Sequence, residues 1–405
     1  MLLKLAWRNV WRNRRRSLIT ICATAVTVFL CLFSNAFTDG WFGEMVAAAT
    51  RYPLGHIQLH APGYLPDRPL YETLIDGDAA LEAARALPHV SAAPRVFGFG
   101  LVGVGDRSGM GELVGIDPVP ESAVSGIDEA VESGRPLGPE AAGEAVIGVK
   151  LAKKLAAKPG DELVILTEAD DGFPGEALYR IVGIARTGDP NRDRTLVLLH
   201  IDDARQLLAL EQRTHEVVVV TADLGHPEPV AAALTASLGD SVEIKTWRQL
   251  QPMLAEMMQM AEAMVWIVLV IVYAISGLGI ANTVLMSVME RNREIGVMMA
   301  IGLKPLRVIS MILLENAGLT LLAAVAGGAV AFASISYWLV NGLDLSSFIS
   351  GLTMDGFTVS PLIHPKLTLG HTIGTFVILV IISTLSALWP AVRAARLDPA
   401  GAIRT

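Results

Sequence analysis

Four long apolar stretches dominate the hydropathy pattern of this chain. Residues 17–38, 263–289, 316–343 and 367–392 contain no Asp, Glu, Lys or Arg. A helix needs about 20 predominantly apolar residues to cross the hydrocarbon core of a bilayer, and each stretch reaches that length. We therefore predict four membrane-spanning helices, at 17–38, 263–289, 308–343 and 367–392, with the third span beginning before its single acid, Glu315.

The segment 39–262, between the first two spans, has a different pattern. Strand-like runs such as 162–167 and 217–221 alternate with helix-like runs such as 79–87 and 230–238. This alternation predicts a mixed α/β domain. Residues 105–143 are richer in Gly, Pro and acids, and we interpret them as a subdomain inserted between two halves of that domain. The fold class is thus an α-helical membrane protein with four transmembrane helices (one plus three) and a mixed α/β extracytoplasmic domain.

The distribution of basic residues predicts the orientation. Residues 1–16 carry six Lys and Arg and no acid, and the loop 290–307 and the tail 393–405 are also basic. Short cytoplasmic loops carry the excess of Lys and Arg in membrane proteins. Both termini and the loop 290–307 are therefore expected in the cytoplasm, and the domain 39–262 and the loop 344–366 outside. Within 1–16, Trp7 and Trp11 beside arginines predict an amphipathic elbow helix in the headgroup layer.

Composition agrees with a membrane protein and offers little chemistry. Only 18% of the residues are charged, against about 25% in soluble domains. Cys22 and Cys31 both lie in the first span, about 13.5 Å apart along a helix, which is too far for a disulfide. The chain has no Gly-Lys dipeptide and hence no phosphate-binding loop of the Walker type. We expect no catalytic residue, no metal site and no cofactor in this chain.

The most informative stretch follows the second span. Glu290, Arg291, Arg293 and Glu294 come directly after the apolar run, and an apolar stripe then continues until Gly302. Simple anchoring of a span would explain the charges but not the stripe. A short cytoplasmic helix that packs into a groove of a partner explains both.

This stretch also carries a resemblance to a known family. Residues 282–302 resemble the pattern Asn-x-x-x-Met-x-Val-x-Glu-Arg-x-x-Glu-Ile-Gly-x-x-x-Ala-x-Gly of FtsX/MacB/Lol-type ABC permeases. The tail 390–404 is similar to their C-terminal ending, and residues 5–14 are similar to their N-terminal elbow. The resemblance implies a mechanotransmission permease that binds no nucleotide itself. A separate cytoplasmic ATPase, in two copies, would bind ATP and Mg²⁺ and dock on the coupling segment, for which we select Glu290, Arg291, Glu294, Ile295, Gly296, Met299 and Gly302.

Within that family the chain looks most like the lipoprotein-releasing permeases of the bacterial inner membrane, which implies a second permease copy, identical or paralogous. An acyl chain would need an apolar cavity between the first two spans, and packing is the alternative role for its candidate residues, Phe29, Phe33, Phe37, Met264 and Ile271. By position, the loop that would contact a periplasmic carrier or adaptor contains Asp170, Asp171, Phe173 and Pro174. Regulation of a cell-wall hydrolase, as in FtsX-type members, and MacB-type efflux remain as alternatives.

Overall fold

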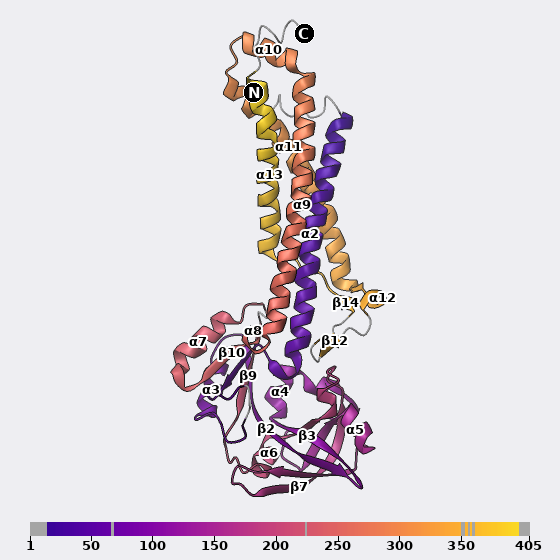
Figure 1. Cartoon of the computed structure of the whole chain (residues 1–405), viewed down its shortest axis with the longest axis vertical. Coiled ribbons are helices and arrows are strands. Elements are labelled where there is room, and N and C mark those ends of the chain that lie inside the picture. Colours follow the sequence, from indigo (N-terminus) through magenta and orange to yellow (C-terminus); the bar gives the residue numbers. More distant parts are fainter. Residues whose placement is uncertain are drawn as a thin grey trace. The chain divides into compact units, whose positions relative to one another are not determined.

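Four long helices occupy the four apolar stretches in the computed structural model (Figure 1). They are α2 (Arg14–Ala49), α9 (Pro252–Glu290), α11 (Pro305–Asn341) and α13 (Leu369–Ala395). Each is long and apolar enough to cross a membrane. The structure describes residues 14–65, 69–222, 225–349, 353–354, 357–358 and 361–396, so most of the predicted elbow and of the tail 393–405 lies outside the described residues.

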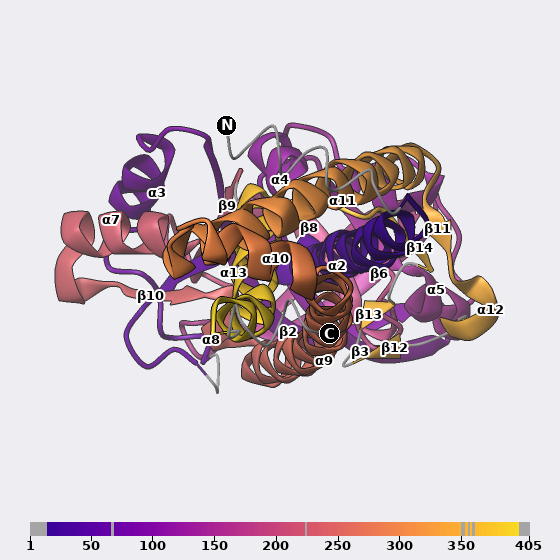
Figure 2. The same ribbon diagram turned by 90° about the horizontal axis from the view of Figure 1, so that it is seen from above.

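Two bodies make up the chain. The helical unit comprises residues 1–42, 257–346 and 361–405, and the α/β unit comprises residues 43–256 and 347–360. In the helical unit, α2, α11 and α13 share an apolar cluster that includes Leu32, Ala331 and Leu379. A second cluster joins α9, α11 and α13 to the short helix α10 (Asn292–Ala300). Figure 2 shows α10 lying across one end of this helix bundle.

Close approach of α2 and α11 depends on a glycine. A Cβ atom at Gly327 would lie 2.3 Å from the carbonyl oxygen of Ala25. Small residues permit such backbone contact between membrane helices, where van der Waals packing replaces the hydrophobic effect as the driving force. The run of small residues in the third span therefore serves helix packing.

The α/β unit is built on one long strand, β2 (Val90–Val104). The first part of β2 pairs antiparallel with β9 (Glu216–Thr221), which is followed in the sheet by β1 (Ile57–His60) and β10 (Glu243–Thr246). Helices α3 (Gly77–Arg85) and α7 (Glu228–Leu238) contribute apolar residues to the same core cluster as these strands.

The second part of β2 belongs to a closed ring of six strands. It pairs with β3 (Arg107–Ile116) and β6 (Glu162–Glu168), and the ring continues through β8 (Leu196–His200), β5 (Glu144–Gly148) and β7 (Pro174–Ala185) back to β6. Its core includes residues of α5 (Val149–Leu155) and α6 (Ile201–Leu207). The predicted inserted subdomain 105–143 is thus corrected, because β3 is a strand of the ring itself.

The remaining elements are short. They are η1 (Thr50–Leu54), α4 (Pro118–Ser125), η2 (Ile127–Ala130), β4 (Val131–Gly134), η3 (Arg192–Arg194), η4 (Gly239–Ser241), α8 (Trp247–Leu250), β11 (Leu343–Asp344), α12 (Ser346–Ile349), β12 (Thr353–Met354), β13 (Phe357–Thr358) and β14 (Leu362–Ile363).

Candidate coupling site

The coupling segment forms a separate short helix because the chain bends at Arg291. Helix α9 ends at Glu290, Arg291 has non-helical dihedrals (φ −112°, ψ 14°), and α10 begins at the next residue. At the other end, the N–H of Gly302 donates to Met299 O and the N–H of Leu303 donates to Met298 O, both at 3.0 Å. These two bonds form a Schellman motif, which requires a left-handed residue, and Gly302 supplies it with φ +101°.

The apolar stripe of α10 packs inside the chain. Ile295 is 1% exposed and belongs to a cluster that includes Val288 and Val308, and Gly296 is also buried. Met299 is only partly buried against the same cluster. The expectation that this stripe faces a partner is therefore corrected for Ile295, and in part for Met298 and Met299, because the chain's own helices cover these residues. The exposed residues of α10 and its cap are Arg293, Glu294, Val297, Ala300, Ile301 and Gly302.

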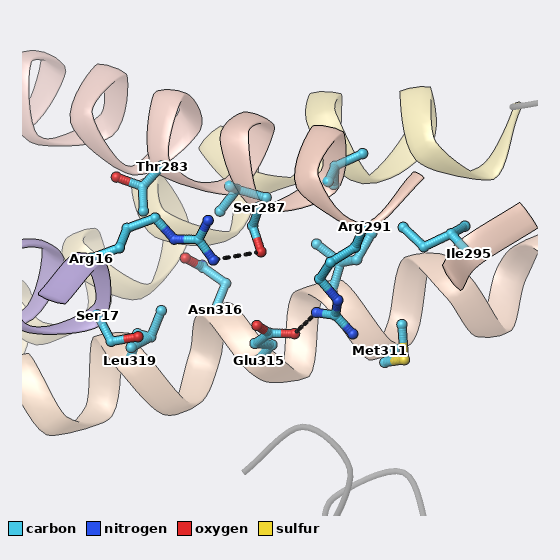
Figure 3. Close-up of a pocket in the computed structure, with 13 residues that line it drawn as sticks. Arg16, Ser17, Thr283, Ser287, Arg291, Ile295, Met311, Glu315, Asn316 and Leu319 are labelled. Atoms are coloured by element: carbon cyan, nitrogen blue, oxygen red, sulfur yellow. Dashed lines mark hydrogen bonds and ion pairs between the residues drawn. The ribbon is translucent and has the colours of Figure 1, made fainter. Parts of the chain in front are cut away.

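Glu290 connects the end of α9 to α2. Its carboxylate lies 2.6 Å from the Nη1 atom of Arg16. The Nη2 atom of the same arginine donates to the Ser287 hydroxyl at 2.9 Å (Figure 3). The Glu290 side chain is 48% exposed, so this ion pair is partly screened by solvent. Glu290 thus has an intramolecular partner besides any contact with an ATPase.

Arg291 is the buried charge of the site. Its side chain is 8% exposed, and its Nη1 atom lies 2.9 Å from a carboxylate oxygen of Glu315 on α11 (Figure 3). Its Nε atom lies 3.4 Å from the carboxylate of Glu294. Sequence reasoning missed the role of Glu315, although its position as a lone acid within an apolar span was a visible signal.

The space between these residues is small. The cavity lined by Arg16, Ser287, Arg291, Glu315 and Asn316 has a volume of about 30 Å³ (Figure 3). That volume suits about one water molecule and is far below the size of a ligand pocket. Among the residues that the structure describes, no group of His, Cys, Asp and Glu could hold a metal ion. The arrangement can transmit a displacement between helices, which needs contact rather than a bound ligand.

The five residues predicted to line an acyl-chain cavity are not brought together. Phe29 and Phe33 stack with ring centroids 5.7 Å apart and pack against the cluster of α2, α11 and α13. Phe37 contacts Trp41 on its own helix, while Met264 and Ile271 are 66% and 53% exposed on α9. It is Cys31 that meets α9, in a cluster with Leu269 and Tyr273. The predicted lining of that cavity is therefore corrected. Cys31 lies two residues from Phe29 and two from Phe33, and successive helix residues turn by about 100°, so these two rings point away from α9.

The predicted carrier-contact loop is the turn of the β6–β7 hairpin. Asp171 accepts a hydrogen bond from the N–H of Phe173 at 3.0 Å, and Asp170 forms an ion pair with Arg213. These two acids therefore hold the turn in place. Phe173 is 71% exposed and Pro174 is also exposed, so these two residues are available for a partner.

The α/β unit contains buried polar groups that sequence reasoning did not select. Arg95 lies 2.6 Å from Glu121 and 3.5 Å from Glu216, and all three side chains are at most 3% exposed. Burial lowers the pKa of His56 to about 4, and its Nδ1 atom accepts a hydrogen bond from the N–H of Thr221 at 3.0 Å. Both arrangements join strands or pack a helix on the sheet, and we assign them to stability.

Comparison with known families gives two matches. Residues 266–399 match the model of the FtsX-like permease C-terminal part, and residues 17–237 match the MacB-like periplasmic core domain. The second match alone covers more than half of the chain. The coupling segment lies inside the first match.

Curated relatives are similar at low identity. The chain is 28% identical over 182 residues to the lipoprotein-releasing system transmembrane protein LolC of Neisseria meningitidis, covering 42% of this chain and 43% of that protein. It is 25% identical to the pyoverdine export ATP-binding/permease protein PvdT of Pseudomonas syringae, over 98% of this chain and 58% of that protein. For LolC of Xylella fastidiosa the identity is 22%, over 96% and 93%. The chain thus spans about half of the length of the first two relatives.

Solved structures with likeness to this chain include the periplasmic region of MacB from Actinobacillus actinomycetemcomitans. The identity is 14% and the TM-score 0.37, over 50% of this chain and 92% of that one. The extracellular domain of the ABC-type transporter YknZ from Gram-positive bacteria gives 14% identity and a TM-score of 0.34, over 47% and 100%.

Proposed function

We propose that this chain, which belongs to the family of ABC transporter permeases with an FtsX-like C-terminal part and a MacB-like periplasmic core domain, couples a cytoplasmic ATPase to work outside the membrane. One observation carries the proposal. A short helix, α10, continues directly from the span α9, lies across the end of the bundle and presents an exposed face. A surface in this position suits a soluble motor that pushes on a span.

The partners follow from this arrangement. Family membership implies an ATPase and a pairing of permeases. In our proposal two ATPase subunits hold the ATP and Mg²⁺, the permease itself catalyses no reaction, and two permease copies match the two ATPases. The basic residues of 1–16 and of 290–307 favour a cytoplasmic position for α10 and both termini, which leaves the α/β unit outside the inner membrane.

For the substrate, we propose a lipid-anchored protein that is extracted from the inner membrane. Support comes from the similarity to a lipoprotein-releasing permease over 93% of that relative's length, together with a hairpin whose exposed Phe173 is available for a soluble carrier. Export of a small molecule is the second candidate, because the similarity to a pyoverdine export protein covers 98% of this chain.

Purification of the tagged chain from membranes tests the function. We expect an ABC ATPase to co-purify and its hydrolysis of ATP to respond to the permease. Mass spectrometry of the complex should then find acylated protein. A small secreted metabolite in its place would favour the second candidate, and the absence of any ATPase would refute the proposal as a whole.

A further inference from the structure

Glu315 is an unusual residue for its position. It is the only Asp or Glu in α11, a helix that otherwise has the hydropathy of a membrane span, and its side chain is 12% exposed. An ionisable residue within a span is costly unless it is paired, and such residues are therefore functional candidates by default. The ion pair with Arg291 offsets that cost. It also joins α11 to the residue at which the chain bends between α9 and α10.

Two of the ion pairs at this end of the bundle, Arg16–Glu290 and Arg291–Glu315, differ in burial. In Arg16–Glu290 the side chains are 22% and 48% exposed, whereas in Arg291–Glu315 they are 8% and 12% exposed. Solvent weakens the first pair and screens the second much less. The contact of Arg291 with α11 is therefore the less screened of the two.

The contact continues from α11 to α13. Asn316, next to Glu315, is 4% exposed and donates to the hydroxyl of Ser383 at 2.7 Å and to its carbonyl oxygen at 3.1 Å. The hydroxyls of Thr320 and Ser383 lie 2.5 Å apart. Two neighbouring residues of α11 thus make polar contacts on different sides: Glu315 with Arg291 at the start of α10, and Asn316 with Ser383 on α13.

We propose that Glu315 is a positioning residue that makes α10 and the adjoining part of α11 move as one body when the ATPase pushes on α10. This inference rests on the proposed function. Without the pair, the push reaches α9 but is transmitted poorly to α11 and α13. Work outside the membrane then falls while ATP hydrolysis continues.

The experiment compares variants of the full chain with the ATPase that co-purifies with it, in vesicles. The variants are Glu315→Gln, Arg291→Gln, the double variant, Glu315→Asp and, as a matched control at an exposed cation of α11, Arg307→Gln. Three quantities are measured: ATP hydrolysis, ATP-dependent release of a purified triacylated lipoprotein, and the distance between spin labels at Val297 on α10 and Leu321 on α11. Cys22 and Cys31 are replaced by alanine for the labelling.

In the parent, the label distance should be the same before and after trapping with ATP and vanadate. In Glu315→Gln it should change on trapping, and release per ATP hydrolysed should fall about two- to thirtyfold. The double variant should lose no more than either single one, because the two residues act through each other. Glu315→Asp keeps the negative charge, so the variant should fold, but its shorter side chain leaves the carboxylate farther from Arg291, and we expect an intermediate loss. Arg307→Gln should match the parent.

Parental release and an unchanged label distance in Glu315→Gln would overturn the inference, as would losses in the double variant that equal the sum of the single ones. If Glu315→Gln fails to fold, parental behaviour of Glu315→Asp would overturn it in the same way. Failure of the proposed function is distinguishable, because the parent itself would then bind no ATPase or release nothing.

Discussion

The contact between α2 and α11 leads to a quantitative prediction at Gly327. A Cβ atom there would lie 2.3 Å from Ala25 O and 2.9 Å from the carbonyl carbon and Cα of Ala25. These are backbone atoms of a helix, so they cannot rotate away as a side-chain end can. Gly327→Ala must therefore push the two helices apart.

The expected cost follows from a matched position on the same helix. Gly318 has no atom within 4 Å of its added Cβ, so Gly318→Ala experiences only the gain in helix propensity, about 1 kcal/mol. Gly327→Ala has the same gain but adds the cost of overpacking, which is about 1–3 kcal/mol. The free energies of unfolding of the two variants should differ by about that amount, with Gly327→Ala the less stable.

Tryptophan fluorescence during denaturation in detergent measures this difference, since the chain has seven tryptophans. Gly318→Ala should be at least as stable as the parent. Equal stability of Gly327→Ala and Gly318→Ala would show that α2 and α11 do not approach each other as closely as the structure has them.

Three further predictions concern single side chains. Glu294→Lys changes the charge of a residue that is 51% exposed on α10, and co-purification of the ATPase should be lost while membrane insertion is normal; retained binding would remove Glu294 from the contact. Phe33→Ala should cost about 1–3 kcal/mol in denaturation experiments, below the full cost of a buried ring because Phe33 is only half-buried, and an unchanged stability would indicate a lipid-facing ring. The pKa of His56 is lowered to about 4, so between pH 6.5 and 4 the unfolded chain binds a proton that the native chain does not. The free energy of unfolding should therefore fall as the pH drops from about 6.5 to about 4. His56→Gln should flatten this pH dependence of stability, and an unchanged pH dependence in that variant would contradict the prediction.

The spans could be predicted from sequence because a charge-free apolar run long enough to cross a bilayer is rare in soluble domains. The ends of the helices could not. The charge-free run begins at residue 263, but helix α9 already begins at Pro252. The additional residues include the charged Glu256 and Glu262, which are helical although they interrupt the apolar pattern. Hydropathy predicts the part of a helix that crosses the hydrocarbon core, whereas the full length of the helix also depends on residues outside the membrane.

The coupling segment was predictable as an element, but the direction of its faces was not. Helical spacing places Ile295 and Met299 on one face, yet it does not say whether that face meets a partner or the chain itself, and the structure has it covered. The pair of Arg291 and Glu315 joins the bend between α9 and α10 to α11 over 24 positions, which no local pattern encodes. For the same reason sequence could show that Phe29 and Phe33 share a face but not which helix they meet.

The central claim, that α10 receives an ATPase, is tested most directly by a photo-crosslinking amino acid at Ile301. This residue caps α10 and is 82% exposed, and Ile75 in the α/β unit, 87% exposed, is the matched control. On illumination in cells, Ile301 should capture an ABC ATPase, identified by mass spectrometry, and Ile75 should not. Capture of the ATPase at Ile75, or its absence at Ile301, would contradict the account.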